Sequence, residues 1–265
     1  MNVAQLIGEA ERTWRRATTY GDSWRQITAV PEMPTQIDRA TFASLFPGAE
    51  IPDEEHSYGF PPTAAGLSSR AYGISPDGWV GAIPVEPERA PRWIWAVKRG
   101  GDFYYREVPW EDEPSTSTKG HIHVGSILQI ALCTVFFLRN LAKRCAFPDT
   151  LPYTLQFDAE GVSGRGLVGY RPIPQSQLLP GFHPVDEPRT LSSGNHLSVS
   201  VRATIGEMKT DPLAVGYGLV GELALVLRPD LVEPSKLKDQ LRRRHAQDVE
   251  GPRIRFLGFL DGVLK

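Results

Sequence analysis

The stretch RWIWAVKRGGDFYYREV at residues 92–108 decides the fold class. Two runs rich in aromatic and β-branched residues flank a glycine pair at 100–101, followed by Asp102. Glycine and aspartate are the residues that tight turns favour. Aromatic side chains on facing strands stabilise an antiparallel pair. The stretch therefore predicts a β-hairpin with strands over 92–98 and 103–108.

Toward the N-terminus, a second hairpin is predicted. Strands over 69–74 and 79–85 flank Pro76-Asp77-Gly78, a typical turn sequence. Residues 17–67 contain prolines at 31, 34, 47, 52, 61 and 62, and we expect them to be irregular apart from a short helix over 39–46. Apolar residues at helical spacing predict an amphipathic helix over 2–16.

Toward the C-terminus, the strongest element is a helix over 124–145. It is apolar on most faces, which is typical of a central, buried helix. Strands are predicted over 153–158, 162–170 and 196–204, the last with strict apolar–polar alternation. Asp211-Pro212 is a typical helix start, and that helix is expected to run to 227. A basic helix over 235–247 and an edge strand over 254–264 complete the prediction.

Hairpins followed by helices, without a repeated βαβ pattern, favour the α+β class. We expect antiparallel hairpins packed on a long buried helix, in two similar-sized halves. The acidic and Ser/Thr-rich segment 111–120 is the predicted boundary. Residues 1–115 would hold the N-terminal helix and the hairpins, and residues 116–265 a helix–sheet–helix region with the basic C-terminal helix. One continuous domain is the alternative.

Composition narrows the functional class. The 265 residues carry a net charge of −2, which excludes a uniformly basic surface for nucleic acid. Cys133 and Cys145 fall in one predicted helix, about 18 Å apart, too far for a disulfide. Free thiols fit a reducing compartment. No signal sequence is apparent, and the apolar run 127–138 is too short to span a bilayer. We therefore expect a cytoplasmic protein that does not associate with membranes.

A serine hydrolase is one alternative. Gly21-Asp22-Ser23 resembles the nucleophile block of the Gly-Asp-Ser esterases, and Asp53 and His56 form an Asp-x-x-His. Such a serine follows a buried strand, and its histidine comes from a distant loop. Neither condition is met around Ser23. The contiguous run Ser193-Gly194-Asn195-His196 spells residues that these enzymes take from four separate blocks, so it does not indicate a site.

A metal-assisted hydrolase is the related alternative. His121 and His123 alternate along a short segment, so both imidazoles could reach one metal ion from a strand. A third ligand is not identified by spacing, and a solvated segment leading into the long helix explains the pair equally well. The glycines at 161, 164 and 166 precede strand-like residues rather than a helix, which argues against a phosphate loop. The sequence predicts no cofactor.

Two further residue groups suggest binding. The predicted hairpins concentrate aromatic side chains, which are enriched where proteins contact partners or ligands; these are Trp79, Trp93, Trp95, Tyr104 and Tyr105. Segment 236–255 carries a local net charge of +4 and includes Arg242, Arg243 and Arg244, which could contact nucleic acid phosphates. A solvated basic helix end explains the arginines as well.

The chain also resembles a known group of proteins over roughly residues 55–228. Phe60-Pro61-Pro62, Asp77-Gly78-Trp79-Val80, the long apolar helix, Leu155-Gln156-Phe157 with Gly161-Val162-Ser163-Gly164, and the Asp211-Pro212 helix follow one another in a similar order. Together they resemble the C-terminal region of bacterial proteins that carry an Alba/Schlafen-type DNA-binding domain in their N-terminal half. That domain is absent here, so the resemblance transfers no DNA-binding or catalytic residue. It implies a regulatory or recognition module acting beside a partner.

The sequence therefore favours a non-enzymatic module that binds a protein partner or a small ligand, as an accessory component of a bacterial multi-gene system. The hydrolase centred on His121 and His123 and a nucleic-acid accessory protein using Arg242 to Arg244 remain alternatives.

Overall fold

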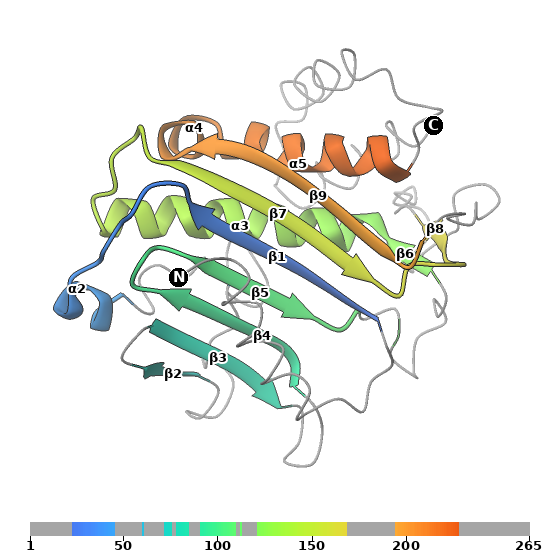
Figure 1. Ribbon diagram of the computed structural model, residues 1–265, viewed down its shortest axis with the longest axis horizontal. Helices are drawn as coiled ribbons and strands as arrows, with labels where there is room; N and C mark the ends of the chain where they lie inside the picture. Colours follow the sequence, from blue (N-terminus) through green and yellow to red (C-terminus); the bar gives the residue numbers. More distant parts are fainter. Residues whose placement is uncertain are drawn as a thin grey trace, which may run out of the picture.

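A computed structural model describes residues 23–45, 60, 72–75, 78–84, 91–109, 112, 121–168 and 194–227. Its centre is a seven-stranded antiparallel sheet in the order β2-β3-β4-β5-β1-β7-β9 (Figure 1). The strands are β1 (Trp24–Pro31), β2 (Tyr72–Ser75), β3 (Gly78–Pro84), β4 (Pro91–Lys98), β5 (Phe103–Glu107), β7 (Pro152–Glu160) and β9 (His196–Thr204). The α+β class with antiparallel strands is confirmed.

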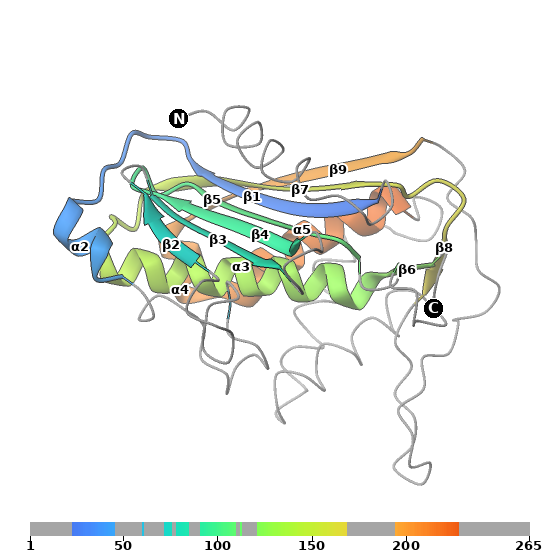
Figure 2. The ribbon, with the colours of Figure 1, turned by 90° about the horizontal axis from the view of Figure 1, so that it is seen from below.

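Four helices accompany the sheet in the described ranges: α2 (Arg39–Ala43), α3 (Val124–Arg144), α4 (Ile205–Thr210) and α5 (Pro212–Leu227). Figure 2 shows α3 and α5 on the same side of the sheet. A short parallel pair, β6 (His121–His123) with β8 (Gly166–Val168), lies beyond one end of the sheet. No helix in these ranges is both long and apolar enough to cross a membrane.

The predicted hairpin over 92–108 is confirmed as β4 and β5. Its turn is closed by Lys98 N–H, which donates to the Asp102 carbonyl at 2.8 Å. Gly101 has φ +84°, and a Cβ there would lie 2.7 Å from the Tyr153 hydroxyl oxygen. That hydroxyl donates to the Gly101 carbonyl at 3.1 Å. The turn needs glycine both for its backbone conformation and for the close approach of Tyr153.

The expectation that residues 17–67 are irregular is wrong for β1, which is an interior strand of the sheet. β1 pairs with β5 on one side and with β7 on the other. Both of its faces are buried from Arg25 to Ala29. Polar and apolar residues alternate only over the four residues 26–29, because Trp24 lies on the polar side and Arg25 on the core side, so the local pattern is too short to predict a strand. Pro31 lies at the end of β1, where a proline is tolerated.

The strand predicted over 162–170 is also different in the structure. β7 extends to Glu160, and the following β8 spans three residues and pairs in parallel with β6. On the side away from β1, the antiparallel neighbour of β7 is β9. Gly161, at φ +76°, ends β7 and turns the chain away. The six-residue helix α4 was not expected; a capping box between Thr204 and Glu207 starts it.

The main apolar core lies between the sheet and α3. Side chains from alternate positions of the strands meet those of the helix; the largest fully buried ones include Trp95, Phe103, Phe137, Tyr153 and Phe157. Phe103 and Phe137 join sheet and helix directly, with ring centroids 4.8 Å apart. Strands from both predicted ranges, 1–115 and 116–265, lie side by side in this one sheet.

Candidate functional site

Over β5, β1, β7 and β9, the side of the sheet opposite α3 carries mainly polar side chains. Because side chains alternate along a strand, the strand register places hydrophilic residues of four neighbouring strands in rows across this side. We call it the polar face; its members are Trp24, Gln26 and Thr28 of β1, Tyr104 and Arg106 of β5, Gln156 and Asp158 of β7, and His196, Ser198, Ser200 and Arg202 of β9.

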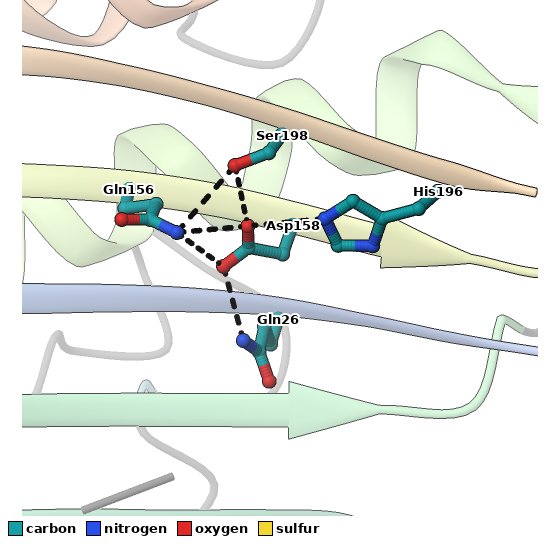
Figure 3. Close-up of polar contacts among 5 residues, drawn as sticks. All are labelled: Gln26, Gln156, Asp158, His196 and Ser198. Carbon is teal, nitrogen blue, oxygen red and sulfur yellow. Dashed lines mark hydrogen bonds and ion pairs between the residues drawn. The ribbon is translucent and has the colours of Figure 1, made fainter. Parts of the chain in front are cut away.

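Asp158 is the centre of the polar face (Figure 3). One row of Cα partners runs from Gln26 through Asp158 to Ser198. Gln26 Nε2 donates to Asp158 Oδ2 at 3.0 Å, and Ser198 Oγ donates to Oδ1 at 2.6 Å. Gln156 Nε2, two residues along β7, donates to Oδ1 at 2.9 Å and to Oδ2 at 3.1 Å. Three adjacent strands thus contribute donors to one carboxylate.

Aromatic and cationic groups flank this row. The Arg106 guanidinium lies 4.0 Å from the centroid of the Trp24 ring, a cation–π distance. Trp24 meets the ring of His196 edge to face, with centroids 6.4 Å apart. His196 Nε2 lies 3.9 Å from Asp158 Oδ1, which makes an ion pair only when the imidazole is protonated. Tyr104 donates to the Gln26 Oε1 atom at 3.4 Å, on the far side of the row.

Exposure rises across the polar face from β5 toward β9. Asp158 and Gln26 are both 3% exposed, and Tyr104 is fully buried. Gln156 and Trp24 are half-buried, whereas His196 and Ser198 are exposed. The network is therefore accessible from β9. The hydroxyl of Thr28, which is 1% exposed on the same face, makes no hydrogen bond to any described residue.

The geometry suits recognition better than nucleophilic chemistry. A carboxylate has about four acceptor positions, and those of Asp158 are filled by Gln26, Gln156 and Ser198. In a serine hydrolase the histidine lies between serine and carboxylate, but here Ser198 bonds the carboxylate directly. Asp158 instead fixes the rotamers of its donors. The arrangement presents oriented amide, hydroxyl and imidazole groups at an exposed margin.

A second polar group is enclosed on the α3 side. Arg25 Nε contacts Glu107 Oε1 at 2.5 Å, and the Tyr105 hydroxyl donates to the other oxygen of Glu107. Burial, with the Glu107 charge next, raises the pKa of Tyr105 well above its ordinary value. The phenol therefore stays protonated and keeps donating. Arg25 is 4% exposed, so this cluster ties β1 to β5 inside the core.

Ser23, the serine of the Gly-Asp-Ser motif, lies at the start of β1. Its hydroxyl donates to the Asp112 carboxylate, which also bonds the Arg165 guanidinium at 2.8 Å. The ion pair with Arg165 makes the Asp112 carboxylate a weaker base toward the Ser23 hydroxyl. Asp53 and His56 lie outside the described residues.

The structure separates the predicted aromatic residues. Trp95 and Tyr105 point to the α3 side and are buried there, whereas Tyr104 belongs to the polar face and is buried beneath it. Trp79 and Trp93 lie in β3 and β4, and their side chains are outside what the structure describes. The described aromatic residues of the hairpins thus do not form one exposed surface.

The remaining predicted residues are only partly placed. His121 and His123 form the ends of β6, directly before α3, and their side chains are outside what the structure describes. Within the described residues, no group of three His, Cys, Asp or Glu is arranged to hold a metal ion. Arg242, Arg243 and Arg244 lie outside the described residues.

Sequence reasoning missed the Asp158 network. The alternation over 196–204 correctly predicts a half-buried strand, and so indicates that His196, Ser198 and Ser200 share one face. What brings Gln26 and Asp158 to that face is the pairing of β1 with β7, residues more than a hundred positions apart. No local pattern around Gln26 signals this pairing.

Comparison with known protein families, curated proteins and solved structures found no match to this chain.

Proposed function

We propose that this chain is a non-enzymatic binding module that recognises a protein partner or a small ligand through the β9 margin of the polar face. The groups that would make contact are His196, Ser198 and Gln156, with Trp24 beside them. The observation that carries the proposal is the buried carboxylate of Asp158, bonded by donors from three adjacent strands. It holds the contact groups in fixed orientations before a ligand arrives.

Burying a carboxylate is costly unless it is fully hydrogen-bonded. The sheet does not need the Asp158 carboxylate for its stability, because its strands are already joined by main-chain hydrogen bonds and by the core under α3. Preorganised polar groups beside an aromatic ring are the usual contents of a specific recognition site. The chemistry fits a ligand rich in hydrogen-bonding groups, such as a polar peptide segment or a hydroxylated small molecule.

The proposal keeps the finer expectations drawn from the sequence. The hairpins and the long helix would form two similar-sized halves of one binding unit, acting as an accessory component of a bacterial multi-gene system. The resemblance to the C-terminal region of Alba/Schlafen-type proteins supports a recognition role beside a partner.

The test compares three forms of the full chain: wild type, His196→Ala and Met33→Ala. Met33 is 45% exposed in the segment after β1 and has no part in the polar face, so it is the matched control. Each form is immobilised and incubated with lysate of the source cells. Species kept by wild type and Met33→Ala but lost by His196→Ala are identified by mass spectrometry, then purified and titrated by calorimetry.

We expect the purified species to bind His196→Ala and Gln156→Ala at least tenfold more weakly than wild type, with unchanged affinity for Met33→Ala. Equal affinity for all folded forms would refute the polar face as the recognition surface. Turnover of the captured species by wild-type protein would instead establish an enzyme.

A further inference from the structure

We propose that β9 is the pairing edge of a homodimer, in which two copies join their sheets antiparallel through β9 about a two-fold axis at Ser200. This inference goes beyond the proposed function, because it concerns the edge of the sheet rather than the ligand. It follows from the main-chain groups that β9 presents, from the pattern of its side chains and from the helix beside it.

Among the described strands, none pairs with the outer edge of β9. Gly161 N–H donates to the Asn195 carbonyl at 3.0 Å, and Ile205 N–H donates to the Leu151 carbonyl at 3.0 Å. These bonds continue the β7–β9 register at both ends, so odd-numbered residues of β9 bond to β7. Because the direction alternates along a strand, the N–H and carbonyl groups of Ser198, Ser200 and Arg202 point outward.

These three residues are exposed, and no hydrogen bond to their outward main-chain groups is found in the part of the chain that the structure describes. β9 is nine residues long, has no proline and pairs with β7 without a bulge. Natural edge strands are usually short, kinked or protected, because an open edge invites another strand. The opposite edge strand, β2, has four residues. The two edges of this sheet therefore differ in their capacity to pair.

A second copy of β9 fits this edge in one register. Antiparallel pairing about Ser200 places Ser200 opposite its own copy and Ser198 opposite Arg202. These are the residues whose main-chain groups point outward, so the pairs would exchange about six hydrogen bonds. On the α3 side, the same register sets Val199 opposite Val201, an apolar pair. No two like charges face each other, as a self-complementary two-fold interface requires.

Side chains connect the edge to the Asp158 network. Ser198 donates to Asp158 at 2.6 Å. The 70% exposed side chain of Arg202 bonds Glu32 at 2.7 Å, on the inner side of β9, and the proposed register places the main chain of Arg202 opposite Ser198 of the other copy. The polar faces of two copies would then form one continuous surface.

The helix α5 supplies the apolar part of the interface. It runs alongside β9 (Figure 1), on the α3 side of the sheet. Its sixteen residues, PLAVGYGLVGELALVL, include a single charged residue, Glu222. Val226 is 52% exposed. A helix that is apolar nearly all round is normally covered on more than one side, and the two-fold axis brings α5 of the second copy to the same side of the joined sheet.

The first experiment is sedimentation of the full chain across the micromolar range. Wild type and Ser200→Ala, which keeps the main-chain N–H, are expected to be dimers. Ser200→Pro removes an outward N–H from an edge position where proline is tolerated, and Ser200→Lys places like charges opposite each other on the axis. Both are expected to weaken the dimer at least tenfold while far-UV circular dichroism stays unchanged. Using two variants keeps the test valid if the proline disturbs the fold.

The second experiment tests the register by disulfide formation. Cα atoms of a hydrogen-bonded antiparallel pair lie about 5.5 Å apart, within reach of a disulfide. Ser200→Cys should therefore cross-link spontaneously in air, whereas Ser198→Cys, four residues or about 14 Å along the strand from its own copy at 3.4 Å per residue, should not. Wild type, with its native cysteines, is the blank. A monomeric wild type, or a dimer unaffected by Ser200→Pro and Ser200→Lys, would overturn the proposal, as would equal cross-linking at 198 and 200. If the monomer instead captures an extended peptide, the edge serves another partner and the homodimer is refuted.

Discussion

Asp158 and Ser198 are Cα partners on neighbouring strands, and the Ser198 hydroxyl donates to the Asp158 carboxylate at 2.6 Å. Asp158 is 3% exposed, whereas Ser198 lies exposed at the edge of the sheet. The bond thus joins the buried centre of the polar face to its accessible margin. Both the proposed recognition surface and the proposed dimer edge depend on this position, the first through the side chain of Ser198 and the second through its main chain.

Asp158→Asn should destabilise the protein by roughly 2 kcal/mol, within the range for losing charged hydrogen bonds to a buried group. The new amide nitrogen replaces one of the two carboxylate oxygens, so N–H groups face a donor that this oxygen accepted from, either Gln26 or Ser198. Ser198→Ala removes one exposed partner of the same carboxylate and should cost about 1 kcal/mol or less. Urea unfolding of the two variants measures the difference. Equal losses would contradict a central role for Asp158.

Asp102 should impose a pH dependence on stability. Burial raises the pKa of its carboxyl above 3.8, with Lys98 acting in the opposite direction. A group whose pKa is raised on folding contributes stability below its unfolded pKa, and the contribution is lost as pH rises through the folded pKa. The stability of wild type minus that of Asp102→Asn should therefore fall as pH rises from 3 to 7. Urea midpoints of both proteins at each pH measure it, and a difference that rises with pH would contradict the assignment.

The sequence predicts the parts of the fold that local patterns encode. The hairpin at 92–108 depends on its own turn glycines, and the strand at 196–204 on its own alternation, so both are found within a residue or two. The helices α3 and α5 are found for the same reason, since their apolar composition and start signals are local. In each case the information lies within about twenty consecutive residues.

The features that sequence reasoning missed depend on strand pairing between distant parts of the chain. β1 is buried on both faces, its polar–apolar alternation covers only residues 26–29, and its neighbours β5 and β7 come from distant parts of the chain. Gln26 becomes a site residue only because that pairing sets it beside Asp158. Among the predicted aromatic residues, alternation sends Tyr104 and Tyr105 to different faces of the sheet, and both are buried.

Gly161 and Gly164 provide a matched pair for backbone strain. Both have positive φ, +76° and +73°, so alanine is strained at either position. A Cβ at 161 would also lie 2.7 Å from the Ser23 Cα, whereas one at 164 would meet no atom within 4 Å. Gly164→Ala should cost about 1 kcal/mol, and Gly161→Ala clearly more. Thermal unfolding compares the stability of the two variants. Similar losses of stability would mean that Ser23 moves freely.

Gly216 and Gly218 provide a matched pair for helix packing in α5. Alanine improves helix propensity by up to about 1 kcal/mol at either position. At 218 a Cβ meets no atom within 4 Å, so Gly218→Ala should stabilise the protein. At 216 a Cβ would lie 2.2 Å from Leu132 Cδ2 and 3.1 Å from its Cγ, so α3 and α5 must separate or Leu132 must leave its rotamer.

Overpacking of this kind costs about 1–3 kcal/mol, which exceeds the propensity gain. We therefore expect Gly216→Ala to lower the midpoint of urea unfolding and Gly218→Ala to raise it. Adding Leu132→Ala to Gly216→Ala would remove the clashing branch, so the double variant should lose less stability than the sum of the single losses. If Gly216→Ala is stabilising by itself, the close contact between the two helices is not rigid, and α5 is free to shift along α3.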